Sequence, residues 1–286
     1  MSDLPLVVVT GATGAVGRHV ASQLAGRARI RLLVRDAGKA RALGLTAEAV
    51  VADYADRPPL REAMAGADAV FVVTANPLRP EHDENLLAAA RSAGVRHAVK
   101  ISWLAVADPA ADDLIARWNR QSEQVLHASG LDWTVLRLRS PMSNTLAWAP
   151  AIRREGVVRA LGGDARTACV DPRDVAAVAV RALTEPGHGG RTYALTGPEP
   201  LSPREQTRVL SEVLERPLRF VELTVDQALE GWRGKLPEPV ARALAEAAAR
   251  RGAGDAVRPE DSLTAVTGRA AGTFADWAAD HATHFR

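Results

Sequence analysis

Three glycines spaced three residues apart lie near the start of this chain, between an apolar run and an amphipathic segment. Residues 6–10 are apolar or β-branched, and residues 15–26 repeat their apolar positions with the period of a helix. In such a strand–turn–helix, Gly11 permits the tight turn, Gly14 lets the backbone approach a pyrophosphate, and Gly17 lets the helix pack closely on the strand. A plain tight turn needs only one glycine. The sequence therefore predicts a dinucleotide site at the head of this helix, where backbone amides face an anion.

The end of the second predicted strand indicates which dinucleotide binds. An NAD site usually places a carboxylate about 20 residues beyond the glycines to accept from the ribose 2′-hydroxyl, whereas a guanidinium matches a 2′-phosphate. Arg35, helped by Lys39, therefore favours NADPH over NADH. Asp36 follows directly and restores NAD binding if the strand ends one residue later.

Later strand ends supply the adenine and nicotinamide sides of the predicted site. Asp53 ends the third strand where an adenine edge would lie, although it would equally cap the next turn. Residues 73–75 end the fourth strand beside the ribose and nicotinamide. The predicted cofactor contacts are Thr10, Gly11, Thr13, Gly14, Ala15, Val16, Gly17, Arg35, Lys39, Asp53, Tyr54, Val73, Thr74, Ala75, Ile101 and Arg139.

The order of predicted elements indicates an α/β protein. Short β-branched runs alternate with longer helical patterns over the first 140 residues, which is typical of βαβ units and a parallel sheet covered on both faces. Strands are expected at residues 6–10, 29–35, 48–53, 68–74, 97–102 and 132–138, with helices at 15–26, 38–44, 59–66, 80–93 and 112–129. A helix at 172–183 and a strand at 191–195 follow, and then mostly helix.

This order predicts two domains. A Rossmann doubly wound parallel sheet is expected in residues 1–141, which also receives residues 171–196. A smaller, mainly helical substrate domain is expected in residues 142–170 and 197–286.

Composition excludes several other classes of protein. The 36 Lys and Arg nearly balance 34 Asp and Glu and are interspersed with them, so we expect no nucleic-acid partner despite a pI near 9.0. The single cysteine, Cys169, has no partner for a disulfide or a zinc site, which is typical of a reducing compartment. The first apolar run is too short for a secretory or membrane-spanning segment. We therefore expect a cytoplasmic protein that acts on a small molecule, without metal or membrane.

The motifs along nearly the whole chain resemble the NmrA-like branch of the atypical short-chain dehydrogenases. They lie at residues 10–14 and 17–18, 33–36, 100–102, 129–137, 142 and 144, 171–176 and 193–199. The resemblance implies a Rossmann domain with a small C-terminal substrate domain. It leaves the activity open between reductases of ketones, quinones or dyes and dinucleotide-sensing regulators without turnover.

The acid that short-chain reductases normally use is absent from this sequence. That acid is a Tyr whose pKa is lowered by a Lys four residues later, and it protonates the carbonyl oxygen. Neither Tyr54 nor Tyr193 has a lysine at that spacing, and Ile115 and Asn119 occupy the two places in the expected fifth helix. Hydride transfer therefore needs another oxyanion donor or an acidic hydroxyl within the substrate itself.

Ser102 and Asn119 are the catalytic candidates that remain. Ser102 lies at the carboxyl end of the fifth strand, where doubly wound sheets bind ligands, although a cap or turn role is equally open. Asn119 would orient a water or the ribose, unless it is simply an exposed helical residue. Four large side chains would line a substrate pocket or belong to the core: Trp103, Trp118, Met142 and Trp148.

These observations favour an NADPH-dependent reductase of the ketoreductase or quinone reductase type. It would transfer hydride to a carbonyl of a bulky, aromatic small molecule without the Tyr–Lys pair, in secondary metabolism such as antibiotic biosynthesis. A non-catalytic NAD(P)-sensing regulator is the alternative, and an isomerase or dehydratase with a structural cofactor is a third possibility.

Overall fold

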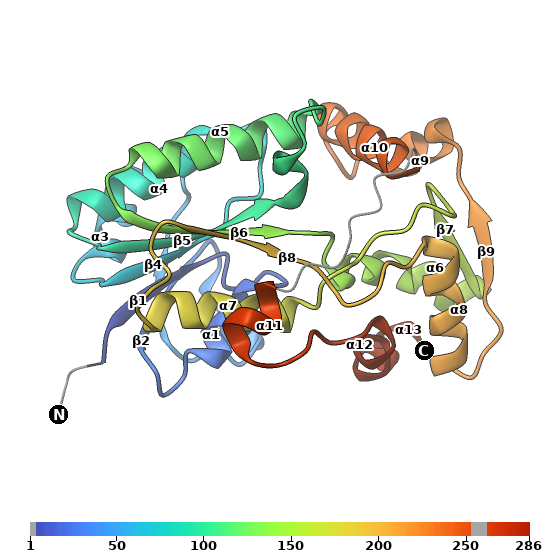
Figure 1. Ribbon diagram of the computed structural model, residues 1–286, viewed down its shortest axis with the longest axis horizontal. Coiled ribbons are helices and arrows are strands. Elements are labelled where there is room, and N and C mark those ends of the chain that lie inside the picture. The colour runs from blue at the N-terminus through green and yellow to red at the C-terminus, as the bar shows by residue number, and fades with distance from the viewer. Residues whose placement is uncertain (1–3, 253–261) are drawn as a thin grey trace.

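One parallel sheet forms the centre of the molecule. In the computed structural model, which describes residues 4–252 and 262–286, seven strands follow the order β3-β2-β1-β4-β5-β6-β8 (Figure 1). Their bounds are β1 (Leu6–Thr10), β2 (Arg29–Val34), β3 (Glu48–Val51), β4 (Ala69–Val72), β5 (His97–Trp103), β6 (Asp132–Leu138) and β8 (Arg191–Leu195). The strand order reverses between β1 and β4, which is the switch point of a doubly wound sheet. The predicted α/β class is confirmed.

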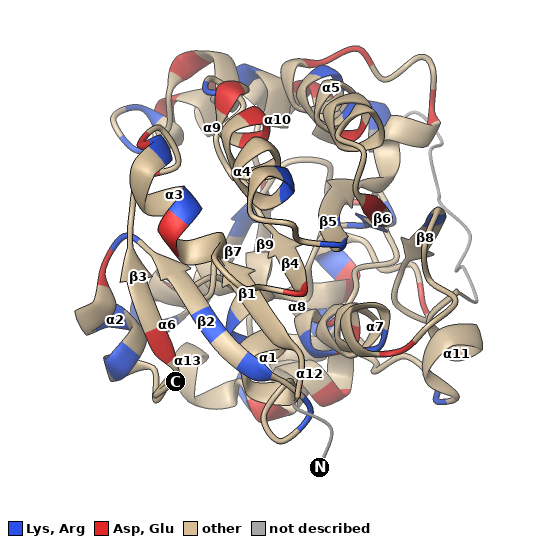
Figure 2. Ribbon diagram, turned by 90° about the vertical axis from the view of Figure 1, so that its left-hand side faces the viewer, with Lys and Arg blue, Asp and Glu red and all other residues tan. Residues whose placement is uncertain are grey.

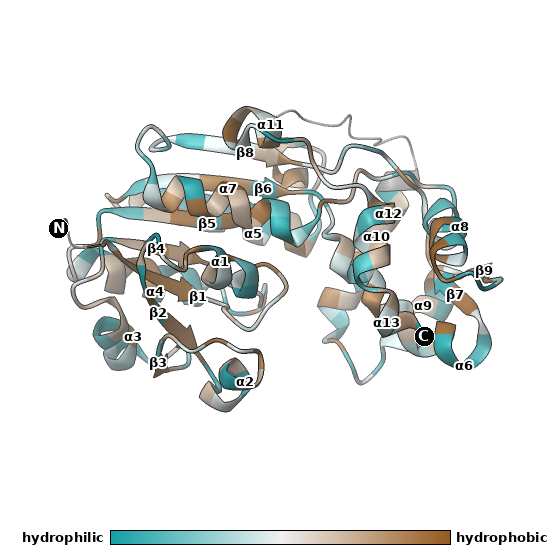
Figure 3. Ribbon diagram, turned by 90° about the horizontal axis from the view of Figure 1, so that it is seen from below, coloured by the Kyte–Doolittle hydropathy of each residue, from teal (hydrophilic) through white to brown (hydrophobic). Residues whose placement is uncertain are grey.

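Helices cover both faces of this sheet. One face carries α1 (Gly17–Gln23), α7 (Pro172–Thr184) and α11 (Ser262–Thr267), and the other carries α3 (Arg57–Met64), α4 (Glu81–Ser92) and α5 (Leu114–Ala128) (Figure 1). The short α2 (Ala37–Ala42) lies between β2 and β3 in the chain. Most residues of the central strands are buried, because both faces of a parallel sheet are covered. Their colour in Figure 3 shows that these strands are largely hydrophobic.

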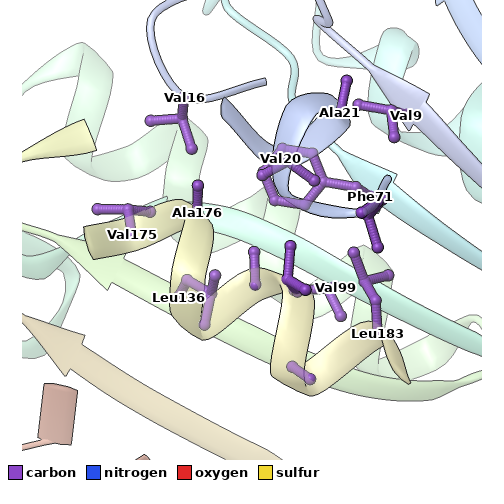
Figure 4. Packing of buried hydrophobic residues seen from close by; sticks show 14 of the residues in the cluster. Val9, Val16, Val20, Ala21, Phe71, Val99, Leu136, Val175, Ala176 and Leu183 are labelled. Carbon is purple, nitrogen blue, oxygen red and sulfur yellow. The ribbon is translucent and has the colours of Figure 1, made fainter. Parts of the chain in front are cut away.

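The core on the α1 and α7 face combines small and large apolar side chains. Figure 4 shows Val20 of α1 and Ala176 of α7 packed with Phe71 of β4 and Leu136 of β6. All four are essentially inaccessible to solvent. This packing fixes the position of α1, and with it the glycine turn that precedes the helix.

The C-terminal part combines helices with a second, small sheet. It contains the 3-10 helix η2 (Met142–Trp148), α6 (Ala149–Glu155), β7 (Val157–Ala160), α8 (Pro203–Val213), β9 (Arg219–Glu222), α9 (Val225–Trp232), α10 (Glu238–Gly252), α12 (Phe274–Asp280) and α13 (Ala282–Phe285). A further 3-10 helix, η1 (Leu104–Ala107), follows β5. β7 and β9 pair in parallel, and the sequence predicted neither strand. Each has only four residues, which is too few to show a clear period of two.

Residues 171–196 lie with the N-terminal sheet in the structure. β8 pairs with β6, and α7 packs on β4, β5, β6 and α1. The division of the chain into two domains at residue 141 stays a prediction.

Local capping explains where several helices begin. Asp113 accepts from the backbone N–H groups of Ile115 and Ala116, at 2.8 and 3.1 Å, so α5 starts two residues later than predicted. Ser202 and Glu205 form a capping box at the start of α8. Both signs of charge are spread over the helices around the sheet in Figure 2, as the balanced composition indicates. Within the described residues, no helix is both long and apolar enough to span a bilayer.

Candidate active site

The glycine turn has the geometry that a dinucleotide cradle requires. Gly11 adopts a left-handed conformation with φ of 59°, and the N–H of Gly14 donates to its carbonyl oxygen at 2.9 Å. A Cβ at Gly17 would lie 2.2 Å from the same oxygen, so helix and turn touch where only glycine fits. Gly14 and its neighbour Ala15 are exposed, which leaves the backbone open to a phosphate group.

Two of the predicted cofactor residues hold this turn in place. The hydroxyl of Thr10 accepts from the N–H of Val73 at 2.7 Å and so joins the ends of β1 and β4. The hydroxyl of Tyr54 accepts from the N–H of Gly11 at 3.1 Å. Burial raises the pKa of the Tyr54 phenol above its ordinary value, so the group stays neutral there. Direct contact of these side chains with a cofactor stays a prediction.

The end of β2 presents cations rather than a carboxylate. Arg35 follows β2 directly and is exposed, as is Lys39. The carboxylate of Asp36 accepts from the N–H of Lys39 at 3.1 Å. Asp36 is therefore the N-cap residue of α2. Asp53 likewise accepts from the N–H of Ala55 at 2.8 Å, which is the turn-capping role left open above.

A large cavity lies at the carboxyl ends of β4, β5 and β6, against the C-terminal part. Its volume is about 970 Å³, the upper end of the range for small-molecule sites. The predicted site residues that line it are Thr74, Ile101, Ser102, Trp103, Asn119, Arg139 and Trp148. Arg139 is buried in this wall and donates from Nε to the hydroxyl of Thr167 at 3.0 Å, which ties the end of β6 to the C-terminal part.

Two predicted pocket residues lie elsewhere. Met142 is 1% exposed and packs with Ile152 and Phe274 in the core of the C-terminal part, which is the core role weighed in the sequence analysis. Trp118 is half-buried on α5 and is not among the residues that line the cavity. Large apolar side chains are more often core than binding surface, and the sequence carries no signal that separates the two.

Ser102 is held by a carboxylate that the sequence analysis missed. Its hydroxyl donates to Oε1 of Glu123 at 2.5 Å, and Arg137 contacts both oxygens of the same carboxylate, at 3.0 and 2.6 Å. Glu123 is 3% exposed, and its hydrogen bonds raise the pKa of Arg137. A serine hydroxyl has one proton, so in this arrangement Ser102 offers a substrate its lone pairs.

A signal for Glu123 was present in the sequence. It lies four residues after Asn119 on α5, so both side chains share one face of the helix. Ser102 and Arg137 are partners in the register of β5 and β6. Only the packing of α5 on that strand pair brings the three together.

Asn119 is buried, which excludes the interpretation as an exposed helical residue. It is 6% exposed, and its Nδ2 donates to the carbonyl oxygen of Ile115 at 2.9 Å. Its catalytic role, like that of Ser102, stays a prediction.

A second buried ion pair supports the β4 side of the cavity. Nζ of Lys100 lies 2.6 Å from Oδ1 of Asp83, and both side chains are 1% exposed. The hydroxyl of Thr74 donates to the same carboxylate at 3.0 Å. This network fixes Thr74 at the cavity wall. Within the described part of the chain, no group of His, Cys, Asp and Glu side chains could hold a metal ion.

Comparison with known proteins identifies the family. A family model described as NAD(P)H-binding matches residues 11–186. The chain belongs to this family. Its fold is shared with NmrA, and the resemblance to the NmrA-like atypical short-chain dehydrogenases is confirmed.

Several relatives match the chain from end to end. It is 52% identical to the (4-alkanoyl-5-oxo-2,5-dihydrofuran-3-yl)methyl phosphate reductase of Streptomyces griseus, over 98% of this chain and 99% of that protein. It is 37% identical to an NAD(P)H azoreductase of Xenophilus azovorans, with the same coverage. The structure of an NADPH-dependent quinone oxidoreductase from Escherichia coli complexed with NADPH has a TM-score of 0.83 at 26% identity, covering 97% of this chain and 99% of that one.

These relatives decide between the two activities that the sequence left open. Each of them is a reductase or oxidoreductase, and each matches both the glycine turn and the C-terminal part. The chain is an NAD(P)H-dependent reductase, and a non-catalytic sensor has less support.

Proposed function

We propose that the protein transfers a hydride from NADPH to the conjugated carbonyl system of a small, electron-poor molecule, and that no side chain protonates the product during the transfer. The nicotinamide supplies the hydride when it is bound. The bond from Ser102 to Glu123 carries this proposal, because it occupies the one hydroxyl proton that the sequence offered as an acid.

An acceptor that receives no proton must carry the negative charge itself. Hydride addition turns a simple ketone into an alkoxide, which needs an acid, whereas hydride addition to a carbon–carbon double bond conjugated with two carbonyls gives a delocalised enolate. The substrate in the name of the S. griseus relative has alkanoyl and 5-oxo groups on neighbouring carbons of a dihydrofuran ring. We propose an acceptor of this class. The hydride forms a new C–H bond at the far carbon of the conjugated double bond, the π electrons of that double bond move to the carbonyl oxygens as an enolate, and water protonates the enolate afterwards.

The cavity wall suits a flat ring of this kind. Trp103 ends β5 and Trp148 ends η2, and both line the cavity beside Ser102 and Asn119. Aromatic faces bind planar conjugated rings and exclude water, which keeps the transfer dry.

We propose NADPH as the preferred cofactor. The exposed guanidinium of Arg35 and the ammonium of Lys39 are available at the end of β2, while Asp36 is engaged as a helix cap. A 2′-phosphate is dianionic near neutral pH and pairs with such cations, whereas a ribose hydroxyl gains little from them.

The setting of the reaction is also a proposal. The near balance of charges supports a small-molecule substrate rather than nucleic acid, and the lone cysteine supports the cytoplasm. The alkanoyl furanone of the S. griseus relative supports a place in secondary metabolism.

A panel of acceptors tests the proposed function. Purified protein and NADPH are mixed separately with a 2-alkanoyl butenolide, a benzoquinone and an aliphatic ketone of similar size, and nicotinamide absorbance is followed. We expect oxidation with the first two and a rate at least about a hundredfold lower with the ketone, which needs the missing acid. Equal rates with the ketone would overturn the proposal.

A further inference from the structure

The cavity changes its chemistry between the strand ends and the C-terminal helices. Near β5 and β6 its wall carries hydroxyl and amide groups from Ser102, Asn119, Ser140 and Asn144. Beyond them Arg159, Thr167 and Gln206 also line the cavity, whereas the stretch contributed by the segment after β9, by α9 and by α10 is mostly apolar. This second region, called the apolar lobe, is lined by Leu223, Ala228, Trp232, Leu236, Leu244, Ala247 and Ala248.

The apolar lobe lies among β9, α9, α10 and the segment that follows β7. Leu223 follows β9, Trp232 ends α9, and Ala248 lies on α10 (Figure 1). A Cβ at Gly162, in the segment after β7, would lie 3.7 Å from the carbonyl oxygen of Ala248. The backbone after β7 and α10 therefore meet at this side of the lobe.

Helix α10 is held against α5, a helix that covers the Rossmann sheet. It packs on α5 and α9, and the guanidinium of Arg250 pairs with the carboxylate of Asp113, whose side chain is fully buried. Asp113 also caps α5, so the pair joins the end of α10 to the start of α5. The lobe is thus a defined part of the fold and is continuous with the reaction site.

We infer that the apolar lobe holds an alkyl chain attached to a carbonyl of the substrate, and that it selects substrates by chain length. This inference rests on the proposed function, because the chain must extend from a carbonyl that is conjugated with the reacting double bond at the polar end. Among these residues the only polar side-chain atom is the indole nitrogen of Trp232, so the lobe favours methylene groups and penalises a hydroxyl or a charge, which would lose most of its water without replacement. The cavity of about 970 Å³ also exceeds what a small ring alone needs.

The alkanoyl group in the name of the S. griseus relative is consistent with this occupant. The residues that line the lobe are those that would contact the chain. Ala247 and Ala248 leave room that a larger side chain on the same face of α10 would fill.

Binding of unreactive saturated analogues tests the inference independently of turnover. Alkanoyl butanolides with chains of four to ten carbons are titrated against the protein with NADPH present, using tryptophan fluorescence. We expect the Kd to fall about fourfold per added methylene until the lobe is full. A Kd that does not depend on chain length would overturn the inference.

Two variants of α10 make the test specific. Ala248→Leu should weaken binding of the eight-carbon analogue at least tenfold and leave the four-carbon analogue within about twofold. Glu246→Leu places the same side chain at an exposed position of the same helix and should change neither. Equal weakening of all chain lengths by Ala248→Leu, or equal effects of the two variants, would overturn the inference.

The proposed function has a separate readout in the same experiment. A benzoquinone without an alkyl chain is assayed with the wild type and with the exposed-position variant Glu246→Leu. We expect the wild type to oxidise NADPH and Glu246→Leu to do so at the same rate. If the wild type does not oxidise NADPH with the benzoquinone, the proposed function is wrong. The inference about chain length is judged on the Kd values alone.

Discussion

The glycine turn and the cavity wall lie at the same edge of the sheet, but different interactions hold them. Backbone geometry holds the turn, since a side chain at Gly17 would collide with the carbonyl of Gly11. Buried charges hold the wall, where Lys100 meets Asp83 at 2.6 Å and Glu123 is bound by two partners.

The difference fits what each region is proposed to recognise. Main-chain groups bind a phosphate whatever side chains surround them, so the turn suits a cofactor that is always the same. Side chains fixed by ion pairs set the shape and polarity of the wall, and they can be replaced to fit another substrate. Four variants separate the contribution of the backbone at the turn from that of the side chains at the wall.

The largest effect is expected at the buried ion pair of the wall. Lys100→Met leaves the Asp83 carboxylate buried without its cation, and should lower the free energy of unfolding by about 3–5 kcal/mol. Urea denaturation measures the change. Arg208→Ala removes an exposed partner of Glu212 and should cost less than about 1 kcal/mol. A loss below about 1 kcal/mol in Lys100→Met would show that charge does not hold the wall.

The turn should respond to a single methyl group. Gly17→Ala places a Cβ 2.2 Å from the carbonyl oxygen of Gly11, and should cost about 1–3 kcal/mol of stability and at least about tenfold in NADPH affinity. Thermal unfolding and fluorescence titration measure the two. Gly231→Ala meets nothing within 4 Å and is the matched control. Wild-type affinity in Gly17→Ala would remove the backbone argument.

Arg35 should affect one cofactor only. Arg35→Ser removes the guanidinium at the end of β2, and should raise the Kd of NADPH about tenfold while that of NADH stays within about twofold. Titrations of the wild type and of Arg35→Ser with NADPH and with NADH measure the Kd values. An equal loss for both cofactors would mean that Arg35 supports the fold rather than a 2′-phosphate.

Ser102 should matter least. Because its proton already bonds Glu123, Ser102→Ala should lower kcat by less than about tenfold, well below the loss of about a hundredfold or more that follows removal of an oxyanion donor. Steady-state turnover with a benzoquinone measures it. A hundredfold loss would restore Ser102 as the donor to the substrate.

The sequence predicted what depends on neighbouring residues and missed what depends on packing. The strand at residues 191–195 and the conformation of Gly11 follow from local pattern, and the structure has both. The contact of Ser102 with Glu123 joins a strand to a helix, so it requires the tertiary structure. Met142 was predicted to line the pocket, but its side chain lies in the core of the C-terminal part. A methionine in a core and a methionine in a binding pocket cannot be told apart from the sequence.

The central claim is that the site transfers hydride without an acid of its own. Single-turnover oxidation of bound NADPH by a benzoquinone tests it, measured from pH 6 to 9 in H₂O and D₂O. The account predicts a rate constant that is flat within about twofold, and a solvent isotope effect near one, because no proton moves in the step. A rate that follows one ionisation across this range, with a solvent isotope effect above about two, would contradict it.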